Sequence, residues 1–370
     1  MVFFASFTAQ NRVIMSRKHA QNEPKNMREE RRIIEVLQNV ESLSRAELAA
    51  AIDFQDSEAT LKRELQRLVQ DGKISVLGKG RSTRYALSPA GRVLSTVDLD
   101  TYFSREIDER HIHASFNFDL VEHILPRVKL FSEDELEHLS SLQSTFRANI
   151  AALPPTEQRR EMTRLGIDLS WKSSQIEGNT YTLLETERLL LEKQAANGKT
   201  REEATMLLNH KKALDFIIDN PDYLKKLSVA RIEDIHRLLV QDLGIEHNIR
   251  QRRVGIIGTN YRPLDNEFQI RKALEATSRL VNGTECIFSK ALLVLVLLSY
   301  IQAFTDGNKR TARITANAVL IAHGYCPLSF RSVDSIDYKK AMLIFYEQNN
   351  LAAFKQIFME QFEFAVNTYF

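Results

Sequence analysis

The sequence predicts a mostly α-helical protein with small β-hairpins. Apolar residues recur at helical spacing over most of the 370 residues. Residues 291–305 carry no charge, which indicates a helix buried on all sides, and the run is short of the ~20 residues that cross a bilayer. Two short β-prone stretches, at 73–87 and 250–264, contain the glycines that turns require. We therefore expect a helical protein with a hairpin in each of these two stretches.

Composition places the chain among ordinary globular proteins. With 44% hydrophobic and 26% charged residues, it can form two or three domains, and a net charge of +2 does not by itself indicate a polyanionic partner. Cys286 and Cys326 are the two cysteines, and they predict no disulfide framework. Residues 1–26 lack a credible targeting signal and are expected to be disordered. We expect a cytoplasmic protein without a membrane segment.

Residues 27–95 are predicted to form a compact unit of three helices and a hairpin. An amphipathic helix comes first, a capping box of Ser44 and Glu47 opens the second helix, and a third helix follows. Strands are predicted at 73–77 and 84–87. This order resembles a winged helix–turn–helix, in which the third helix enters the DNA major groove and the wing contacts phosphate.

Basic residues gather where such a unit would meet DNA. Winged helices also serve as protein-interaction modules, so both kinds of partner stay open. The residues expected to contact DNA are Lys62, Arg63, Arg67, Lys79, Arg81 and Arg84.

Helical segments at 96–160 form the expected connector, and a quick succession of helices follows it. The predicted helices cover 182–194, 199–219 and 228–243. His236 lies in the last of them, and its favoured interpretation is a partly buried helix histidine.

A charged loop at 306–310 ends the uncharged run and opens a helix predicted over 311–320. A glycine turn before a helix N-terminus presents free backbone N–H groups and the positive end of the helix dipole, which suits phosphate. The side chains of residues 308–310 add further donors. Asp306 is the single acid of the loop, and its simplest role is to hold Mg²⁺ together with phosphate oxygens. For this loop alone, an ordinary solvated turn is the alternative.

The whole string from 302 to 313 is similar to the signature of the Fic family, His-x-Phe-x-(Asp/Glu)-Gly-Asn-(Gly/Lys)-Arg-x-x-Arg. The matching residues are Phe304, Asp306, Gly307, Asn308, Lys309, Arg310 and Arg313. Gln302 stands where the family has its histidine. By the resemblance, that histidine takes a proton from the target hydroxyl as it attacks the α-phosphate of ATP. A carboxamide is essentially non-basic, so Gln302 can position a hydroxyl but cannot deprotonate it.

A second stretch, Ser173-Ser-Gln-Ile-Glu-Gly178, resembles the inhibitory motif of the same family, (Ser/Thr)-x-x-x-Glu-(Gly/Asn). Ser173, Glu177 and Gly178 occupy the matching places. The resemblance implies that Glu177 pairs with Arg313 and blocks the γ-phosphate, because a carboxylate and a triphosphate compete for one guanidinium group. Taken alone, the stretch is an ordinary helix end.

The third stretch, residues 250–264, corresponds to the hairpin that Fic proteins use to pair with a target segment, and we call it the flap. A strand is expected at Val254–Ile257 and a tight turn at Gly258–Asn260. An exposed strand edge suits this role because its main-chain groups hold any sequence. A surface hairpin without a partner is the alternative. The flap residues expected to act are Val254, Gly255, Ile256, Ile257, Gly258 and Tyr261.

The resemblance covers about residues 161–346, ahead of a C-terminal helix at 347–370, and implies an all-helical Fic fold with a small β-hairpin flap. It implies transfer of AMP from ATP, with Mg²⁺, to a protein hydroxyl. Without the histidine, a regulator that senses nucleotide without turnover is the second hypothesis. The expected partners are an unknown target protein at the flap and DNA at the N-terminal unit; a homodimer stays open.

Overall fold

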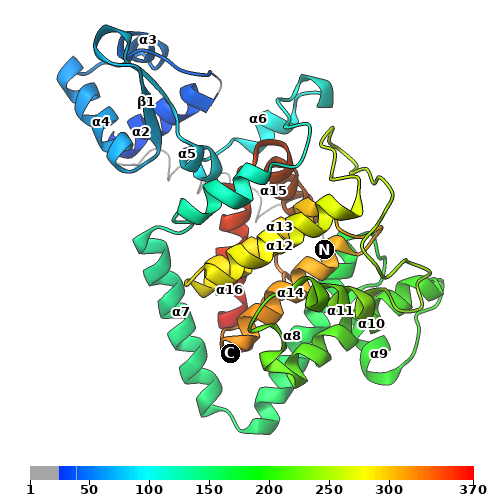
Figure 1. Ribbon diagram of the computed structural model, residues 1–370. Coiled ribbons are helices and arrows are strands. Elements are labelled where there is room, and N and C mark those ends of the chain that lie inside the picture. The colour runs from blue at the N-terminus through cyan, green and yellow to red at the C-terminus, as the bar shows by residue number, and fades with distance from the viewer. Residues whose placement is uncertain (1–24, 39) are drawn as a thin grey trace. The chain divides into compact units, whose positions relative to one another are not determined.

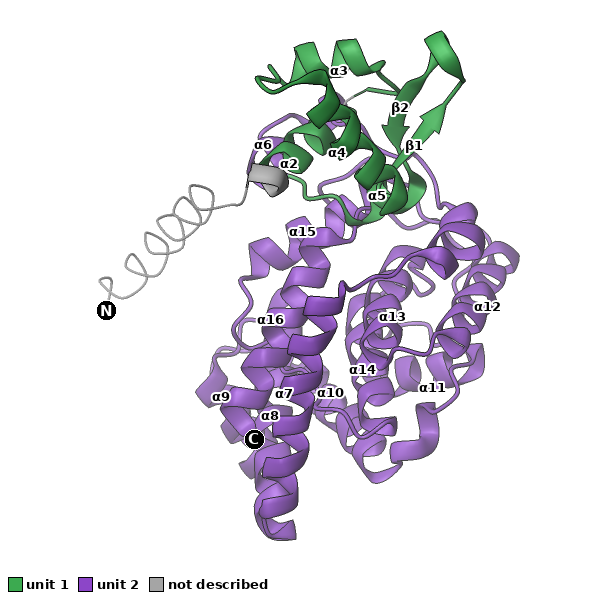
Figure 2. Cartoon of the chain, turned by 90° about the vertical axis from the view of Figure 1, so that its left-hand side faces the viewer, with its two compact units in different colours: residues 1–97 green, residues 98–370 purple. Residues whose placement is uncertain are grey.

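The computed structural model describes residues 25–38 and 40–370, so the stretch 1–24, expected to be disordered, lies outside the described residues. The chain divides into two compact units, residues 1–97 and 98–370, which are coloured separately in Figure 2. Over the described residues, no helix is long and apolar enough to cross a membrane.

The N-terminal unit contains the three helices and the hairpin that the sequence predicts. Its elements are α2 (Lys25–Gln38), α3 (Arg45–Ala51), α4 (Glu58–Gln70), β1 (Ile74–Leu77), a 3₁₀ turn (Gly80–Ser82), β2 (Arg84–Leu87) and α5 (Pro89–Leu94). The capping box is confirmed: the Ser44 hydroxyl accepts from the Glu47 N–H, and the Glu47 carboxylate accepts from the Ser44 N–H. The two strands are antiparallel, with Ile74 opposite Leu87. Ile33, Leu48 and Leu65 belong to a shared core.

The second unit is helical, as predicted. Its α-helices are α6 (Leu99–Phe103), α7 (Glu133–Ala152), α8 (Pro155–Ile176), α9 (Leu183–Glu192), α10 (Arg201–Asp219), α11 (Val229–Val240), α12 (Glu267–Gly283), α13 (Ile287–Ile301), α14 (Asn308–Ala322), α15 (Ser335–Gln348) and α16 (Ala352–Tyr369). Short 3₁₀ or π turns cover Ile107–Glu109, Leu120–Ile124, Leu125–Arg127 and Pro221–Leu224.

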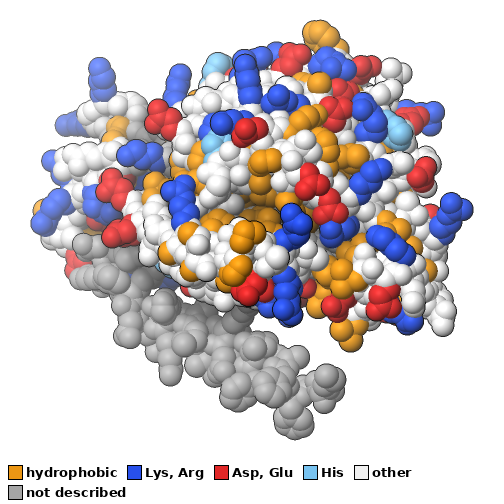
Figure 3. Space-filling view, turned by 90° about the horizontal axis from the view of Figure 1, so that it is seen from below, with side chains coloured by type: hydrophobic (Ala, Val, Ile, Leu, Met, Phe, Trp, Pro, Cys, Tyr) orange, Lys and Arg blue, Asp and Glu red, His pale blue; other side chains and the backbone are white. Residues whose placement is uncertain are grey.

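Charges of both signs are spread over the surface. On the face that Figure 3 shows, basic and acidic side chains are interspersed, with apolar side chains between them. Neither sign dominates this face, which agrees with the small net charge of +2.

Helix α13 is the centre of the second unit, and Figure 1 shows it among α12, α14 and α16. Every residue from Ala291 to Ile301 is buried, as expected for a helix that is apolar all round. It ends at Gln302, whose φ of 52° is left-handed. The chain then turns through the motif loop, defined here as residues 302–307, into α14, which packs along α13.

Helix α14 begins at Asn308, three residues before the predicted start at Thr311. The reason is Gly307, which caps the helix at a φ of +80° that residues with a side chain rarely adopt. Residues 308–310, expected in a loop, therefore form the first helical turn, and their direction is fixed by the helix.

The prediction of a hairpin in the flap is wrong. Residues 254–257 are irregular, and the pairing in this region is an isolated parallel bridge between Ser115 and Arg262. A strand requires a partner for its main-chain groups, and β-propensity alone does not supply one. The fold class itself, a mostly helical protein with one small sheet among the described residues, is confirmed.

Candidate functional site

The side chain of Asn308 closes the motif loop on itself. Its Oδ1 accepts from the Phe304 N–H at 2.8 Å, and its Nδ2 donates to the Phe304 carbonyl at 2.8 Å. The amide oxygen and one of the two Nδ2 hydrogens are therefore used within the loop. Asn308 thus shapes the loop, and its second Nδ2 hydrogen and the backbone N–H groups of the first turn of α14 remain for an anion.

His236 supports the motif loop from α11. Its ring stacks on that of Phe304, with centroids 3.6 Å apart and planes at 4°. Its Nε2 lies 3.0 Å from the Asp306 carbonyl oxygen, and its Nδ1 lies 3.2 Å from that of His247. Burial lowers the pKa of His236 to about 4, so the ring is neutral near pH 7 and donates to one of the two carbonyls. The sequence placed this residue in a helix, but only the fold brings it under the loop.

Arg310 is buried but only partly satisfied. Its side chain is 1% exposed, and Nη2 donates to Asp306 Oδ2 at 3.1 Å. Its Nε and Nη1 are buried without a hydrogen-bond acceptor among the described residues. Burial lowers the pKa of the guanidinium, yet it stays charged at any ordinary pH. A buried cation with two unused donors is costly unless an anion binds it.

Asp306 lies at the rim of the loop, where its side chain is 63% exposed. One carboxylate oxygen accepts from the Gly307 N–H at 2.6 Å, and the other faces Arg310. In the part of the chain that the structure describes, no group of three or more His, Cys, Asp or Glu side chains could hold a metal. A single exposed carboxylate fits Mg²⁺ that arrives with phosphate, because such an ion takes one or two carboxylates and fills its shell with phosphate oxygens and water.

Glu177 and Arg313 form the ion pair that the family resemblance implies. The carboxylate of Glu177 accepts from Arg313 Nη2 at 2.8 Å and from Lys309 Nζ at 3.0 Å. Burial alone raises the pKa of Glu177, but these two cations outweigh it and lower that pKa to about 2. Lys309, expected to be a phosphate donor, is therefore engaged by Glu177, a contact that spacing along the sequence cannot reveal.

All three nitrogens of the Arg313 guanidinium donate hydrogen bonds inside the protein. Its side chain is 0% exposed. Nε donates to Ser173 Oγ at 2.8 Å, Nη1 to the Tyr338 hydroxyl at 3.2 Å, and Nη2 to the Ser173 carbonyl at 3.0 Å as well as to Glu177. Arg310 thus has donors to offer an anion, and Arg313 has them occupied.

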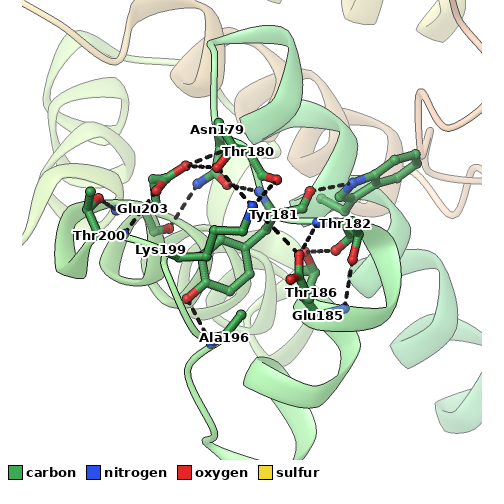
Figure 4. Close-up of polar contacts among 11 residues, drawn as sticks. Asn179, Thr180, Tyr181, Thr182, Glu185, Thr186, Ala196, Lys199, Thr200 and Glu203 are labelled. Atoms are coloured by element: carbon green, nitrogen blue, oxygen red, sulfur yellow. Dashed lines mark hydrogen bonds and ion pairs between the residues drawn. The ribbon is translucent and has the colours of Figure 1, made fainter.

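The chain that follows Glu177 is fastened to the start of α10, as Figure 4 shows. Gly178, at a φ of +99°, ends α8. The Glu203 carboxylate then accepts from the Thr180 N–H at 2.8 Å and from the Thr180 hydroxyl at 2.6 Å. Asn179 Nδ2 donates to the Glu203 carbonyl, and Lys199 donates to the Thr180 carbonyl. Several bonds therefore hold the chain directly after Glu177.

Trp171 of α8 is hydrogen-bonded to the same stretch of chain. Its indole N–H donates to the Tyr181 carbonyl at 3.1 Å, and the Tyr181 hydroxyl accepts from the Ala196 N–H at 3.3 Å. Figure 4 shows the Tyr181 ring lying between these contacts. The helix that carries Glu177 is thus linked to the loop between α9 and α10.

His210 is a second buried histidine at the site, and no sequence pattern indicated its position. It lies on α10, is 0% exposed, and neither ring nitrogen has a hydrogen-bond partner within the described chain. Burial lowers the pKa of His210 well below its ordinary value, and the nearby cations Arg313 and Arg310 lower it further. The ring is therefore neutral and adds no positive charge beside the two arginines.

The flap is anchored at both ends and open between them. Arg250, 1% exposed, donates Nε to the Gln302 carbonyl at 2.6 Å and also reaches two carbonyls of the flap itself. The Tyr261 hydroxyl donates to the Tyr300 carbonyl at 3.0 Å. Ile257 is 99% exposed at the tip. The flap base is therefore tied to the residue that opens the motif loop.

The basic residues expected to meet DNA divide into two groups. Arg67 is held by Glu30 and Glu64, and Arg84 donates to Ser42, so these two act within the fold. The four that are exposed are Lys62, Arg63, Lys79 and Arg81.

The fold and the site define a class: a helical protein in which a short loop between two buried helices carries a buried arginine with unused donors. Residues 226–320 match the model of the Fic/DOC family. The match begins after the stretch that contains Glu177 and does not include the N-terminal unit. The chain therefore carries a Fic domain over residues 226–320.

Relatives and solved structures agree with this assignment. The chain is 29% identical over 222 residues to a protein adenylyltransferase Fic of Nematostella vectensis, covering 58% of this chain and 51% of that protein. It is 29% identical over 161 residues to the protein of that name from Drosophila melanogaster, covering 41% and 32%. It thus spans about half or less of these relatives.

Two solved structures share the fold. Fic-1 (residues 134–508) from C. elegans has a TM-score of 0.55 at 20% identity, covering 64% of this chain and 71% of that chain. A Fic domain protein from Bacteroides thetaiotaomicron has a TM-score of 0.53 at 20% identity, covering 62% and 94%.

Proposed function

We propose that this protein transfers AMP from ATP to a hydroxyl group of a protein target, and that Glu177 holds the activity down. The observation that carries the proposal is Arg310, whose buried guanidinium has two donors without an acceptor in the described chain, beside the N-terminus of α14. Such a group fits a ligand with several anionic oxygens. The relatives named protein adenylyltransferase Fic support ATP as that ligand.

In this proposal, different residues at the loop bind the phosphates and the metal of Mg²⁺-ATP. Arg310 and the first backbone N–H groups of α14 bind phosphate, and the exposed carboxylate of Asp306 takes the metal. Bound Mg²⁺ would neutralise phosphate charge. Asn308 and His236 hold the loop in the shape that presents these groups.

Gln302 limits the chemistry. It lies at the end of α13, and its amide donates to the Ser299 carbonyl at 2.6 Å. The amide cannot accept and keep a proton, so the attacking hydroxyl loses its proton to water instead. Loss of a general base costs about 10²–10⁴-fold, and positioning and electrostatic stabilisation remain. We therefore propose a slow transferase.

Glu177 adds a second restraint. Because all three nitrogens of Arg313 already donate inside the protein, a γ-phosphate competes with the Glu177 carboxylate for this guanidinium. Removal of the carboxylate frees both Arg313 and Lys309. ADP lacks the γ-phosphate, so the restraint acts on ATP more than on ADP.

The flap is the proposed docking place for the target. Its residues 254–257 make no backbone hydrogen bond within the described chain, so an extended target segment can pair with them. This pairing would supply the strand partner that the flap lacks by itself. The docked segment would present a serine, threonine or tyrosine hydroxyl to the motif loop.

The test uses α-labelled ATP with a cell lysate and four proteins: the chain as it is, Glu177→Gly, Gln302→His, and the double variant. We expect the double variant to label protein at least tenfold faster than either single variant, because it has both a free Arg313 and a base, each worth about tenfold or more. Adding Arg310→Ala to the double variant is the matched control and should abolish labelling. ATP and ADP affinities are measured in parallel by calorimetry.

A second function has its own observation in its favour. Gln302 cannot act as a base, and the N-terminal unit is a compact helical domain with a hairpin. Together they fit a regulator that binds ATP or ADP and responds without turnover. If the double variant binds ATP but labels neither itself nor any lysate protein, the transferase proposal is wrong and the regulator takes its place.

A further inference from the structure

The segment at 102–115, just ahead of the long helices of the second unit, lies against the flap. Arg110 Nη2 donates to the Gly258 carbonyl at 3.0 Å. Asn260 Nδ2 donates to Asp108 Oδ1 at 2.8 Å. Gly258 and Asn260, two residues apart in the flap, are thus both tied to residues 108–110 of this segment.

The backbone continues the contact beyond the flap tip. The Arg262 N–H donates to the Ala114 carbonyl at 3.1 Å, and Ser115 forms a parallel bridge with Arg262. The segment therefore follows the second half of the flap. Residues 254–257, in the first half, keep their main-chain groups free within the described chain.

Arg110 is the strongest of these links because it is buried and paired. Its side chain is 5% exposed, and Nη1 donates to Glu347 Oε1 at 3.1 Å. Glu347 is 0% exposed, and its other oxygen accepts from the Tyr102 hydroxyl at 2.6 Å. Removing one member of a buried pair leaves the other uncompensated, so loss of this pair is strongly destabilising. Its anchor lies on α15, outside the flap.

Arg110 uses the two ends of its guanidinium for two different partners. One end pairs with Glu347 on α15 and the other binds the flap at Gly258, where φ is +90°. A lysine carries one compact ammonium and cannot span both acceptors in this way. The geometry therefore fixes where the flap turns, and with it the position of the neighbouring Ile257, whose side chain is almost fully exposed.

We propose that Arg110 is a positioning residue for the protein target. By holding the Gly258 carbonyl against α15, it fixes the position of residues 254–257 and of the exposed Ile257. An extended, partly apolar target segment can then pair with the free main-chain groups of residues 254–257. The inference rests on the proposed function, because it assigns the flap to the target. The second unit begins at Asp98, directly after the N-terminal unit. The segment that positions the flap therefore lies near the start of the second unit.

The test compares Arg110→Gln with Arg105→Gln in full-length protein that carries Glu177→Gly and Gln302→His. Arg105 is exposed and lies in the same segment, so its variant controls for loss of a positive charge. For Arg110→Gln we expect hydrogen exchange of the Arg262 amide, which donates to the Ala114 carbonyl, to rise about tenfold, because local opening becomes easier. Labelling of lysate protein should fall at least tenfold, while ATP affinity stays within about twofold. Arg105→Gln should change none of these.

Loss of Arg110 leaves Glu347 buried and unpaired, so the variant Arg110→Gln with Glu347→Gln is included. This double replacement removes the charge imbalance but does not restore the bond to the Gly258 carbonyl. We therefore expect hydrogen exchange in the flap to remain high in it. Unchanged exchange of the Arg262 amide in both variants overturns the inference. So does a fall in ATP affinity equal to the fall in labelling, since a merely structural role produces that. If the parent protein labels nothing, the proposed function fails, and exchange alone then decides whether Arg110 holds the flap.

Discussion

Glu177 and Arg313 are joined by an ion pair of 2.8 Å, although 136 residues separate them in the chain. Ser173 makes the pair specific, because its hydroxyl and its carbonyl both accept from the same guanidinium. Lys309 approaches the carboxylate from the first turn of α14. One acidic side chain thus engages two of the cations beside the candidate phosphate site, which is how an intramolecular carboxylate can imitate a bound anion.

The pH dependence of this pair has a definite sign. The pKa of Glu177 falls from 4.5 to about 2 on folding, so its contribution to stability is present above pH 4.5 and is lost as the pH falls through about 2. We expect the difference in unfolding free energy between the protein and Glu177→Gln to be constant between pH 8 and about 6, and to shrink towards pH 3. Chemical denaturation at several pH values measures it. A difference that grows on acidification contradicts the assignment.

Arg310 should determine nucleotide affinity. Replacing it with alanine removes the buried donors, and we expect ATP affinity to fall at least tenfold in calorimetry, since a charge-assisted bond is worth about 1.5–3 kcal/mol. Arg331→Ala is the control, because Arg331 also pairs with an aspartate, Asp168, but its side chain is 41% exposed. Equal affinities for the protein and Arg310→Ala would remove the site from consideration.

Gly307 should tolerate no side chain. A Cβ there would meet Val240 Cγ1 at 3.1 Å in addition to the strain of a φ of +80°. Gly324, at the other end of α14, has a similar φ of +69° but no described atom within 4 Å, so Gly324→Ala isolates the backbone strain, about 1 kcal/mol. We expect Gly307→Ala to lower thermal stability more than this control and also to weaken ATP binding. Equal losses would mean that the close packing of the loop on α11 is unimportant.

Trp171 is the single tryptophan of the chain, so its fluorescence should report on the hydrogen bonds between Thr180 and Glu203. Thr180→Val and Glu203→Gln weaken the bonds that hold the chain after Glu177, so we expect Trp171 emission to shift to the red and the affinity for ATP to rise relative to ADP. Thr200→Ala is the matched control, because it removes a cap of α10 and leaves Thr180 in place. Identical spectra for all three variants would show that the contact does not hold α8.

The N-terminal unit supports a prediction of its own. If it binds DNA, affinity should fall steeply with salt, with a slope of about −0.9 per phosphate contact in a plot of log affinity against log salt. Reversing the charges of Lys62 and Arg63, both exposed on α4, should abolish binding. Reversing the adjacent lysines Lys225 and Lys226 of the second unit is the control. Binding that ignores both salt and the first pair of changes would indicate a protein partner.

Local patterns predicted much of this molecule because their physics is local. A long uncharged run is typical of a buried helix, so α13 followed from residues 291–305 alone, and the capping box of Ser44 and Glu47 lies within one helical turn. The resemblance of residues 302–313 to the Fic signature indicated the family domain from the order of the residues alone. The flap failed as a predicted strand because strand formation depends on a partner, which no local pattern contains.

The candidate site required the tertiary structure, because its contacts join residues far apart in the chain. Asp306 and Arg310 lie four residues apart across the start of α14. The proximity of Glu177 to Lys309, and of His236 to Phe304, depends instead on how α8 and α11 pack against α14. Burial then decided the charges: His236 is neutral because it is enclosed, and Arg310 has unused donors because its described neighbours offer too few acceptors. The sequence determined which groups are available, and packing determined which of them are already engaged with each other.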